Sequence, residues 1–582
     1  MYLRRCRKVV AGTTYAYWQL VETRRTARGP RQHIVAYLGD MNEPGRLGIT
    51  EAARGNDGAH QERLLGPSVT PEWVEVDTAR LRVERVRDFG AYWVGCQVLE
   101  RLGLRAFLDG VLGRGREEVP WSVMTLVLVL MRLVDPASEL RIAEHLFERS
   151  ALGDLLGIPL DKVNDDRLYR ALDKLHPHKA ALEKHLKDRL GQLFHLAYDL
   201  LLYDVTSTYF EGTCARNPQA RHGYSRDKRS DCKQVVIALV VSREGMPLGY
   251  EQFAGNRADV STVKEIVEKI EAQYGQAERI WVMDRGMISE KILAFLRSAG
   301  RRYIVGTPRG QLRQFAAELA QTEGWQTLQE GLSVKQLTPA GSTESFLLCR
   351  SLPRQDKEKA MRQRFAERIE AELTKLAAAC QGEKRRRPSA VERRVGALLS
   401  QNSRARSLFA VQVETRPDGG AMVTWERRED VTLWAELKEG CYMLRTNIQG
   451  GDAEQVWHSY IQLTEAEAAF RIQKSDLGIR PIWHQTEERV ASHILVCFLA
   501  YVVWKTLGGM CKAAGLGDAP RKVLDELGGI KMVDVVLPTR GGVELRRRCI
   551  AQPTRAQAIL LDRLKLRLPT STAAENMQGN VV

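Results

Sequence analysis

The chain has 582 residues, 44% hydrophobic and 27% charged, so it is long enough for several globular domains and ordinary in composition. Its 87 Lys and Arg exceed its 72 Asp and Glu by 15 charges, which favours a polyanionic partner without establishing one. The ten cysteines form no CxxC pair or Cys/His set, and this excludes a zinc finger and a thioredoxin-like site. The longest apolar runs, 123–134 and 494–504, are shorter than a membrane span, and no secretory signal is visible, so we expect a cytoplasmic protein without a membrane partner.

Residues 1–60 predict a small β-rich arm, because TTYAYWQLVETRR and RQHIVAYLGD mix aromatic, β-branched and polar residues. From 80 to 195 apolar residues recur at intervals of three and four, which predicts several short helices. This helical domain is a candidate for DNA binding. A packing domain that touches no DNA is an equally good interpretation, since the pattern locates no recognition helix.

The period changes again after residue 196, where strands and helices alternate. AYDLLLYDVTSTYF is an apolar run that leads into Asp204, and two strands around the turn REGMP follow it. A helix over 261–274, the strand RIWVMD ending in Asp284, a helix over 288–300 and another strand come next. A single Asp at a strand end is most simply a cap or a turn residue. Two of them on separate strands favour a site, because ligands in α/β sheets bind beyond the carboxyl ends of strands.

The stretch from 311 to 450 has a mixed pattern that indicates an insertion. GWQTLQEGLSVKQLTPAGSTESFLLCRS predicts strands, KEKAMRQRFAERIEAELTKLAAACQ a charged amphipathic helix, and FAVQVETRPDGGAMVTWER a hairpin over PDGG. We expect this part to be separate from the strands and helices before it.

A helix is predicted from residue 460 to residue 474. At 100° per residue, one stripe of it contains Tyr460, Leu463, Glu467, Arg471 and Lys474. Alone, this stripe is better explained as a plain exposed surface with a Glu467–Arg471 ion pair, which contributes only ~0.2 to 0.5 kcal/mol. His484 and His493 follow, and we expect them to be packed or hydrogen-bonded.

In combination these segments resemble the DDE transposases of bacterial insertion sequences, in the insertion-sequence-four-like superfamily and its 1634-type branch. That superfamily is marked by the signature YxxRxxxExxxxxxK, and Tyr460, Glu467 and Lys474 stand at its spacings. LYDVTSTYFEG and WVMDRGMIS resemble its first and second aspartate blocks. Leu463 departs from the signature, which has arginine there, and Arg471 one turn beyond Glu467 could supply the missing charge.

The resemblance implies an α/β fold: an RNase H-like catalytic domain interrupted by a β-rich insertion and preceded by the β arm and the helical domain. The implied segments are 196–310 for the first part of the core, 311–450 for the insertion, 451–515 for the second part with the catalytic helix, and 516–582 for a C-terminal region. Asp204, Asp284 and Glu467 would be the catalytic residues and the ligands of two Mg²⁺ ions, with Mn²⁺ as a plausible substitute, because these ions prefer oxygen ligands.

The resemblance also implies a reaction. Water would cleave each element end, and the released 3′-hydroxyl would attack target DNA at the same site. The candidates for contacting DNA are Tyr460, Arg471, Lys474 and Arg285. We expect a homodimer on double-stranded DNA, because two ends are processed together. The alternatives are a metal-dependent nuclease that does not join DNA and a transposase-derived DNA-binding protein that has lost catalysis. The presence of all three acids counts against the second.

Overall fold

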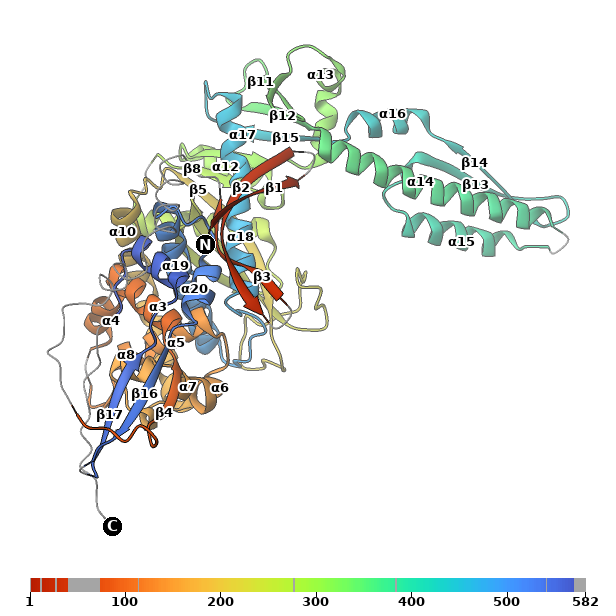
Figure 1. Ribbon diagram of the computed structural model, residues 1–582. Helices are drawn as coiled ribbons and strands as arrows, with labels where there is room; N and C mark the ends of the chain where they lie inside the picture. The colour runs from red at the N-terminus through yellow and green to blue at the C-terminus, as the bar shows by residue number, and fades with distance from the viewer. Residues whose placement is uncertain are drawn as a thin grey trace. The chain divides into compact units, whose positions relative to one another are not determined.

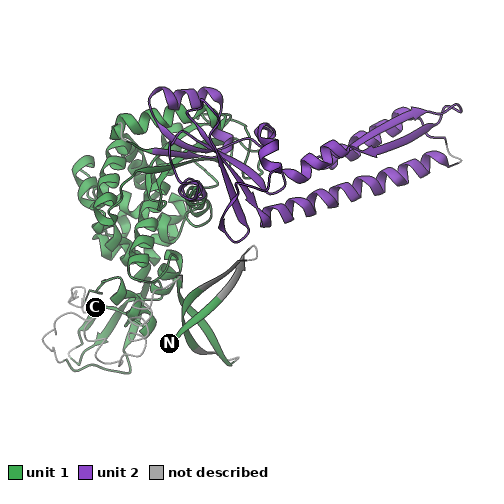
Figure 2. Ribbon diagram, turned by 90° about the horizontal axis from the view of Figure 1, so that it is seen from above, with its two compact units in different colours: residues 1–10, 14–279, 462–582 green, residues 11–13, 280–461 purple. Residues whose placement is uncertain are grey.

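The computed structural model describes residues 2–10, 13–26, 29–39, 74–113, 115–275, 278–382, 385–540 and 542–569. Part of the expected N-terminal arm, residues 40–60, lies outside them. The chain divides into two compact units, coloured in Figure 2: unit 1 consists of residues 1–10, 14–279 and 462–582, and unit 2 of residues 11–13 and 280–461. Each unit is described by itself.

Unit 1 begins with a sheet in the order β1-β2-β3 (Figure 1). Its strands are β1 (Tyr2–Val10), β2 (Thr13–Thr26) and β3 (Gly29–Gly39). The predicted arm is therefore formed by strands, and β3 contacts helix α20 (Pro520–Leu527). At Gly517, before α20, φ is +78° and a Cβ atom would lie 1.8 Å from the carbonyl oxygen of Tyr37. Only glycine allows this approach between the sheet and the loop before α20.

Helices predominate between the arm and the first aspartate block, as the periodicity predicts. The longer ones are α3 (Gly90–Arg101), α4 (Leu104–Leu112), α5 (Trp121–Val134), α9 (Asp165–Leu175) and α10 (Lys179–Phe194), and the short ones are α6 (Glu139–Arg141), α7 (Phe147–Arg149) and α8 (Leu152–Leu156). Local capping fixes some starts, since the Asn164 side chain accepts a hydrogen bond from the backbone N–H of Arg167 before α9.

One strand interrupts this helical region. The predicted helical pattern starts with a strand, β4 (Arg82–Asp88). This strand pairs with β16 (Lys531–Pro538), and β17 (Glu544–Ile550) completes a sheet of order β17-β16-β4. The expectation of helix at this point was wrong, because the partner strand lies far along the chain and local periodicity does not reveal it. Helix α21 (Arg555–Arg563) follows the sheet.

The core of unit 1 is centred on α19 (Glu487–Ala513), which contacts α5 and α9. By length and composition α19 could cross a membrane, and it extends well beyond the apolar run noted in the sequence. Of its most apolar window, however, 89% is buried inside the protein. Helix α19 is therefore a helix of the protein core.

Three antiparallel strands carry the first aspartate block. They are β5 (Leu200–Tyr209), β6 (Gln234–Ser242) and β7 (Pro247–Ala254), adjacent in that order, and β6 is buried at every position. The turn REGMP joins β6 to β7 as predicted, and helix α11 (Val263–Tyr274) follows. Helix α18 (Leu463–Ser475), from much later in the chain, packs against β5. Strands of this order with a covering helix fit an RNase H-like domain.

Unit 2 contains a mixed sheet with strand order β10-β11-β12-β15-β9-β8. Its strands are β8 (Ile280–Met283), β9 (Arg302–Gly306), β10 (Gln326–Gln329), β11 (Leu332–Leu337), β12 (Ser345–Ser351) and β15 (Cys441–Thr446). Strands β8 and β9 are parallel, with helix α12 (Glu290–Ser298) between them in the chain. The order strand, helix, strand is the one that the sequence predicts, and a helical connection of this kind suits parallel strands.

The insertion contains more helix than expected. The hairpin of β13 (Phe409–Thr415) and β14 (Ala421–Arg427) forms over PDGG as predicted, but it packs against α14 (Leu352–Gln381), a helix of 30 residues, and α15 (Pro388–Gln401). These elements have their own core, which includes Leu373. The shorter helices of unit 2 are α13 (Ala316–Ala320), α16 (Glu429–Leu437) and α17 (Ala453–Ile461). "β-rich" thus describes only part of residues 311–450.

Candidate functional site

Asp204 lies in the middle of β5, and the prediction that it ends a strand was wrong. The strand continues to Tyr209 because the β-branched residues after Asp204 stay paired with β6, with Asp204 itself opposite Leu239. The half-buried carboxylate accepts a hydrogen bond from the backbone N–H of Val205 at 2.7 Å. Strand alternation places Asp204 on the face opposite to Val205. The acid is thus presented from the face of a rigid strand rather than from a loop.

Glu467 is presented by α18, which is shorter than the predicted helix. A turn at Gln462 separates α17, which ends at Ile461, from α18, which begins at Leu463. The buried face of α18 includes Leu463, Ala466, Ala469, Phe470 and Gln473, whereas Glu467 and Arg471 are exposed. Leu463, which departs from the signature, therefore belongs to the packed face of the helix.

The carboxylate of Glu467 has no hydrogen-bond or ion-pair partner among the described residues. The Glu467–Arg471 pair of a plain surface helix is accordingly not formed. Neighbouring Glu465, in contrast, pairs with Lys505 at 3.3 Å. Because α18 packs on β5, Glu467 and Asp204 come from contacting elements of unit 1.

Asp284 lies in unit 2, directly after β8, where the sequence predicts a strand-end acid. It is exposed and accepts a hydrogen bond from the Tyr460 hydroxyl at 3.2 Å. Burial and the nearby Asp284 carboxylate raise the pKa of Tyr460 above its usual value, so the phenol keeps its proton and remains a donor. A Cβ atom at Gly306 would lie 2.4 Å from the Tyr460 hydroxyl oxygen, so glycine leaves room for this ring. Tyr460 thus orients Asp284, and Arg285 beside it is exposed.

Lys474, at the end of the predicted stripe, is engaged inside unit 1. Its Nζ atom lies 2.9 Å from Oδ1 of Asp227, and Arg480 contacts the same oxygen. Burial lowers the pKa of Lys474, while Asp227 opposes that shift. The sequence analysis missed Asp227 and Arg480, because no spacing connects residue 227 with a helix about 250 residues later.

The predicted acids offer only carboxylate oxygens, the donor set that Mg²⁺ and Mn²⁺ prefer. Asp204 and Glu467 belong to unit 1 and Asp284 to unit 2. The contacts of two of these acids leave them suited to a metal: Tyr460 donates to Asp284, which leaves its charge intact, and Glu467 has no cation beside it among the described residues. The residues present therefore fit a hard divalent cation.

A second group in unit 1 has a composition that could also hold a metal ion. Ligand atoms of Glu139, His484 and His493 lie within 4.8 Å of one another, and all three residues are buried. His484 Nε2 lies 3.4 Å from Glu139 Oε1. In His493, Nε2 lies 3.1 Å from the carbonyl oxygen of Ile479, and Nδ1 lies 3.5 Å from Arg132 Nη2. A guanidinium group beside Nδ1 opposes a second cation there, so these residues form an internal polar network.

Burial, hydrogen bonds and neighbouring charges together determine which residues of this network are ionised. Although burial acts to raise it, the hydrogen bond from His484 and nearby charges lower the pKa of Glu139 to about 2. Burial and the charge of Arg132 lower the pKa of His493 to about 3. At neutral pH Glu139 is ionised and His493 is neutral. Both histidines are buried and in polar contact, as the sequence predicts.

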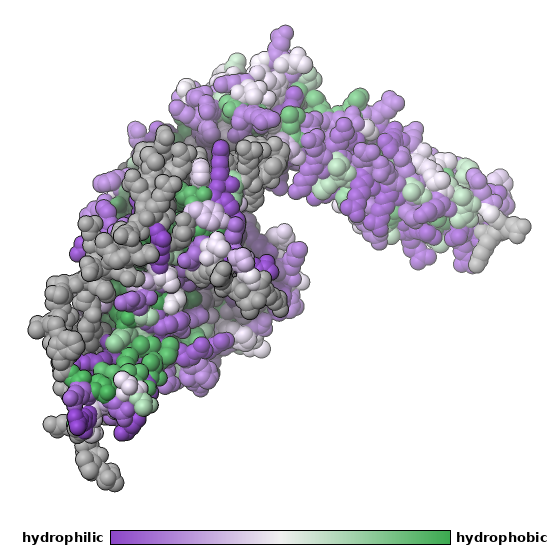
Figure 3. All heavy atoms as spheres, in the orientation of Figure 1, coloured by the Kyte–Doolittle hydropathy of each residue, from purple (hydrophilic) through white to green (hydrophobic). Residues whose placement is uncertain are grey.

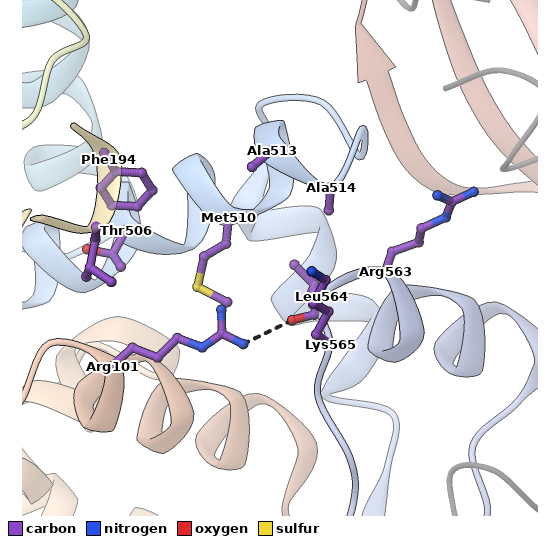
Figure 4. Close-up of a pocket in the computed structure, with 10 residues that line it drawn as sticks. Arg101, Phe194, Thr506, Met510, Ala513, Ala514, Arg563, Leu564 and Lys565 are labelled. Atoms are coloured by element: carbon purple, nitrogen blue, oxygen red, sulfur yellow. Dashed lines mark hydrogen bonds between the residues drawn. The ribbon is translucent and has the colours of Figure 1, made fainter. Parts of the chain in front are cut away.

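A cavity of about 280 Å³ lies elsewhere in unit 1 and is shown in Figure 4. Apolar side chains of Phe194 and Met510 line it together with Arg101, Arg563 and Lys565. Arg101 donates a hydrogen bond to the carbonyl oxygen of Leu564 at 3.2 Å. None of the site residues predicted from the sequence lines this cavity. The candidate site is therefore defined by the acidic residues and not by this cavity.

The chain matches a known protein family. The model of the family described as "Transposase DDE domain" matches residues 195–503, more than half of the chain. The matched span begins before β5 and ends within α19, and it includes all three predicted acids. No curated protein matches the chain.

Proposed function

The chain belongs to the transposase DDE domain family, and from this premise we propose that it cleaves the ends of a bacterial insertion sequence and joins their 3′-hydroxyls to target DNA. The observation that carries the proposal is the family match across β5, β8 and α18, the elements that present the predicted acids. The spacing of Tyr460, Glu467 and Lys474 supports placement in the insertion-sequence-four-like superfamily and its 1634-type branch.

We propose Asp204, Asp284 and Glu467 as the metal ligands, for two Mg²⁺ ions or for Mn²⁺ in their place. Bound divalent ions supply an activated oxygen nucleophile and stabilise the leaving oxygen in phosphodiester chemistry. The contribution of the chain itself is positioning: β5 and its pairing with β6 fix Asp204, the hydroxyl of Tyr460 fixes Asp284, and the packed face of α18 turns Glu467 outward.

Basic surface residues support DNA as the partner. Arg471 and Arg285 are exposed and close in sequence to Glu467 and Asp284, so they are suited to hold phosphates near the cut. In unit 2, exposed arginines without an ion-pair partner among the described residues lie on α15 and beside it: Arg385, Arg387, Arg393, Arg394, Arg404 and Arg406. The face of α14 and α15 in Figure 3 is mostly hydrophilic. The insertion thus offers a second DNA-contacting surface, and two copies of the chain would hold two element ends.

The test uses the full chain, Mg²⁺ and labelled DNA that contains the element ends. We expect Asp204→Asn, Asp284→Asn and Glu467→Gln each to abolish cleavage and joining while DNA binding remains. Glu465→Gln is the matched control, because Glu465 is on the same helix but is paired with Lys505, and this variant should still cleave. Cleavage by the Glu467→Gln variant would refute the assignment of Glu467. Cleavage without joined products would favour the nuclease alternative.

A further inference from the structure

The loop between β5 and β6 brings an acidic side chain to the end of α18. The carboxylate of Asp227, in this loop, is only 4% exposed. One of its oxygens, Oδ1, contacts both Lys474 Nζ, at 2.9 Å, and Arg480 Nη1. The side chains of Lys474 and Arg480 retain 12% and 32% exposure. Two cations therefore share a single carboxylate oxygen near the surface of unit 1.

This arrangement is incomplete as an internal ion pair. The second oxygen of Asp227, Oδ2, is buried and has no hydrogen-bond partner among the described residues. Neighbouring Arg226 does not satisfy it, because that guanidinium is paired with Asp259. A buried carboxylate is well stabilised only when donors satisfy both of its oxygens. Lys474 and Arg480 together carry two positive charges, whereas Asp227 supplies one negative charge. In addition, one oxygen of Asp227 has no donor among the described residues.

The position of this group relative to Glu467 is defined by α18. Lys474 follows Glu467 by seven residues, ~10 Å along a helix that rises 1.5 Å per residue. Phosphates of one DNA strand follow each other every ~3.4 Å along the duplex axis, so a strand cut at Glu467 would have another phosphate within reach of Lys474. The loop is at the surface, since the side chain of Tyr224, three residues before Asp227, is 85% exposed.

We propose that Lys474 and Arg480 form a binding site for a DNA backbone phosphate, and that Asp227 occupies this site until DNA displaces it. The proposal rests on the proposed function and adds Arg480 and Asp227 to it. A phosphate offers the same kind of anionic acceptor as a carboxylate, with more oxygens to satisfy both cations. Asp227 keeps the two cations in place and prevents them from attracting other anions before DNA arrives.

The test measures binding of the full chain to a 40-base-pair duplex, without divalent metal, over a range of salt concentrations. We expect Asp227→Asn to bind about tenfold more tightly than the wild type, because the competing carboxylate has lost its charge. The dependence on salt should keep its slope, since the same phosphates are contacted in both complexes. Asp231→Asn is the matched control: it changes the net charge equally at an exposed position of the same loop, where the acid pairs with Arg229. This control should bind much less tightly than Asp227→Asn.

Two further variants complete the design. Lys474→Gln should weaken binding and reduce the salt slope by about one, and in the Lys474→Gln/Arg480→Gln background Asp227→Asn should give no gain. An Asp227→Asn protein that binds no more tightly than Asp231→Asn would overturn the proposal. If Asp227→Asn does not fold, unchanged affinity and slope in folded Lys474→Gln would overturn it. These results are separable from the proposed function, which fails if the wild type does not cleave element ends.

Discussion

Acid should destabilise unit 1 through His493, whose pKa of about 3 in the folded chain lies far below the ordinary 6.5. Between these values the unfolded chain binds a proton that the folded chain does not, so stability is greatest above pH 6.5 and falls as pH falls. From pH 8 to pH 5 the loss from this residue is about 2 kcal/mol, at 1.36 kcal/mol per pH unit below 6.5. Glu139, with its pKa of about 2, adds to the loss only below its ordinary value of 4.5.

Urea unfolding of the wild type and of His493→Gln at pH 8, 7, 6 and 5 measures this effect. The glutamine amide can still donate to the carbonyl oxygen of Ile479, so the comparison isolates the buried imidazole. The difference in unfolding free energy between the two proteins should change by about 2 kcal/mol over this range. His145→Gln, at an exposed histidine, should follow the wild type. Equal losses in the wild type and His493→Gln would refute the reasoning.

Three other substitutions have defined outcomes. Leu373→Ala opens a cavity in the core of the insertion and should cost about 2–5 kcal/mol in chemical unfolding, whereas exposed Leu433→Ala should cost little. Gly517→Ala should destabilise more than Gly515→Ala in thermal unfolding: both have positive φ, but only the first places its Cβ against the N-terminal sheet. Tyr460→Phe removes the hydrogen bond to Asp284 and should slow metal-dependent cleavage about tenfold; an unchanged cleavage rate would remove Tyr460 from the site.

Helices and strands that depend only on neighbouring residues could be predicted from the sequence. The hairpin of β6 and β7 was predicted because a turn motif separates two apolar runs, and the strand ending at Asp284 because apolar residues stop abruptly there. Asp204 shows the limit of this reasoning. An acid within an apolar run suggests a strand end, but pairing with β6 continues the strand on both sides of it.

Features that depend on distant partners could not be predicted. β4 is a strand only because β16 pairs with it, about 450 residues later. Leu463 departs from the signature. The reason is that it lies on the buried face of α18, which is visible only in the folded chain. Asp227 reaches Lys474 and Arg480 from a loop whose sequence, GYSRDKRSD, is typical of an ordinary charged turn. Residues that neutralise one another through such contacts leave no periodic signal.

The packing of α19 against α5 has a consequence for biosynthesis. Helix α5 is buried on nearly every side, and part of its cover is supplied by α19, which the ribosome completes more than 350 residues later. Until then the apolar side chains of α5 lack this partner, a condition in which nascent chains aggregate or require chaperones. A product truncated before residue 487 would lack this partner permanently. Premature termination should therefore yield insoluble protein rather than a free DNA-binding fragment.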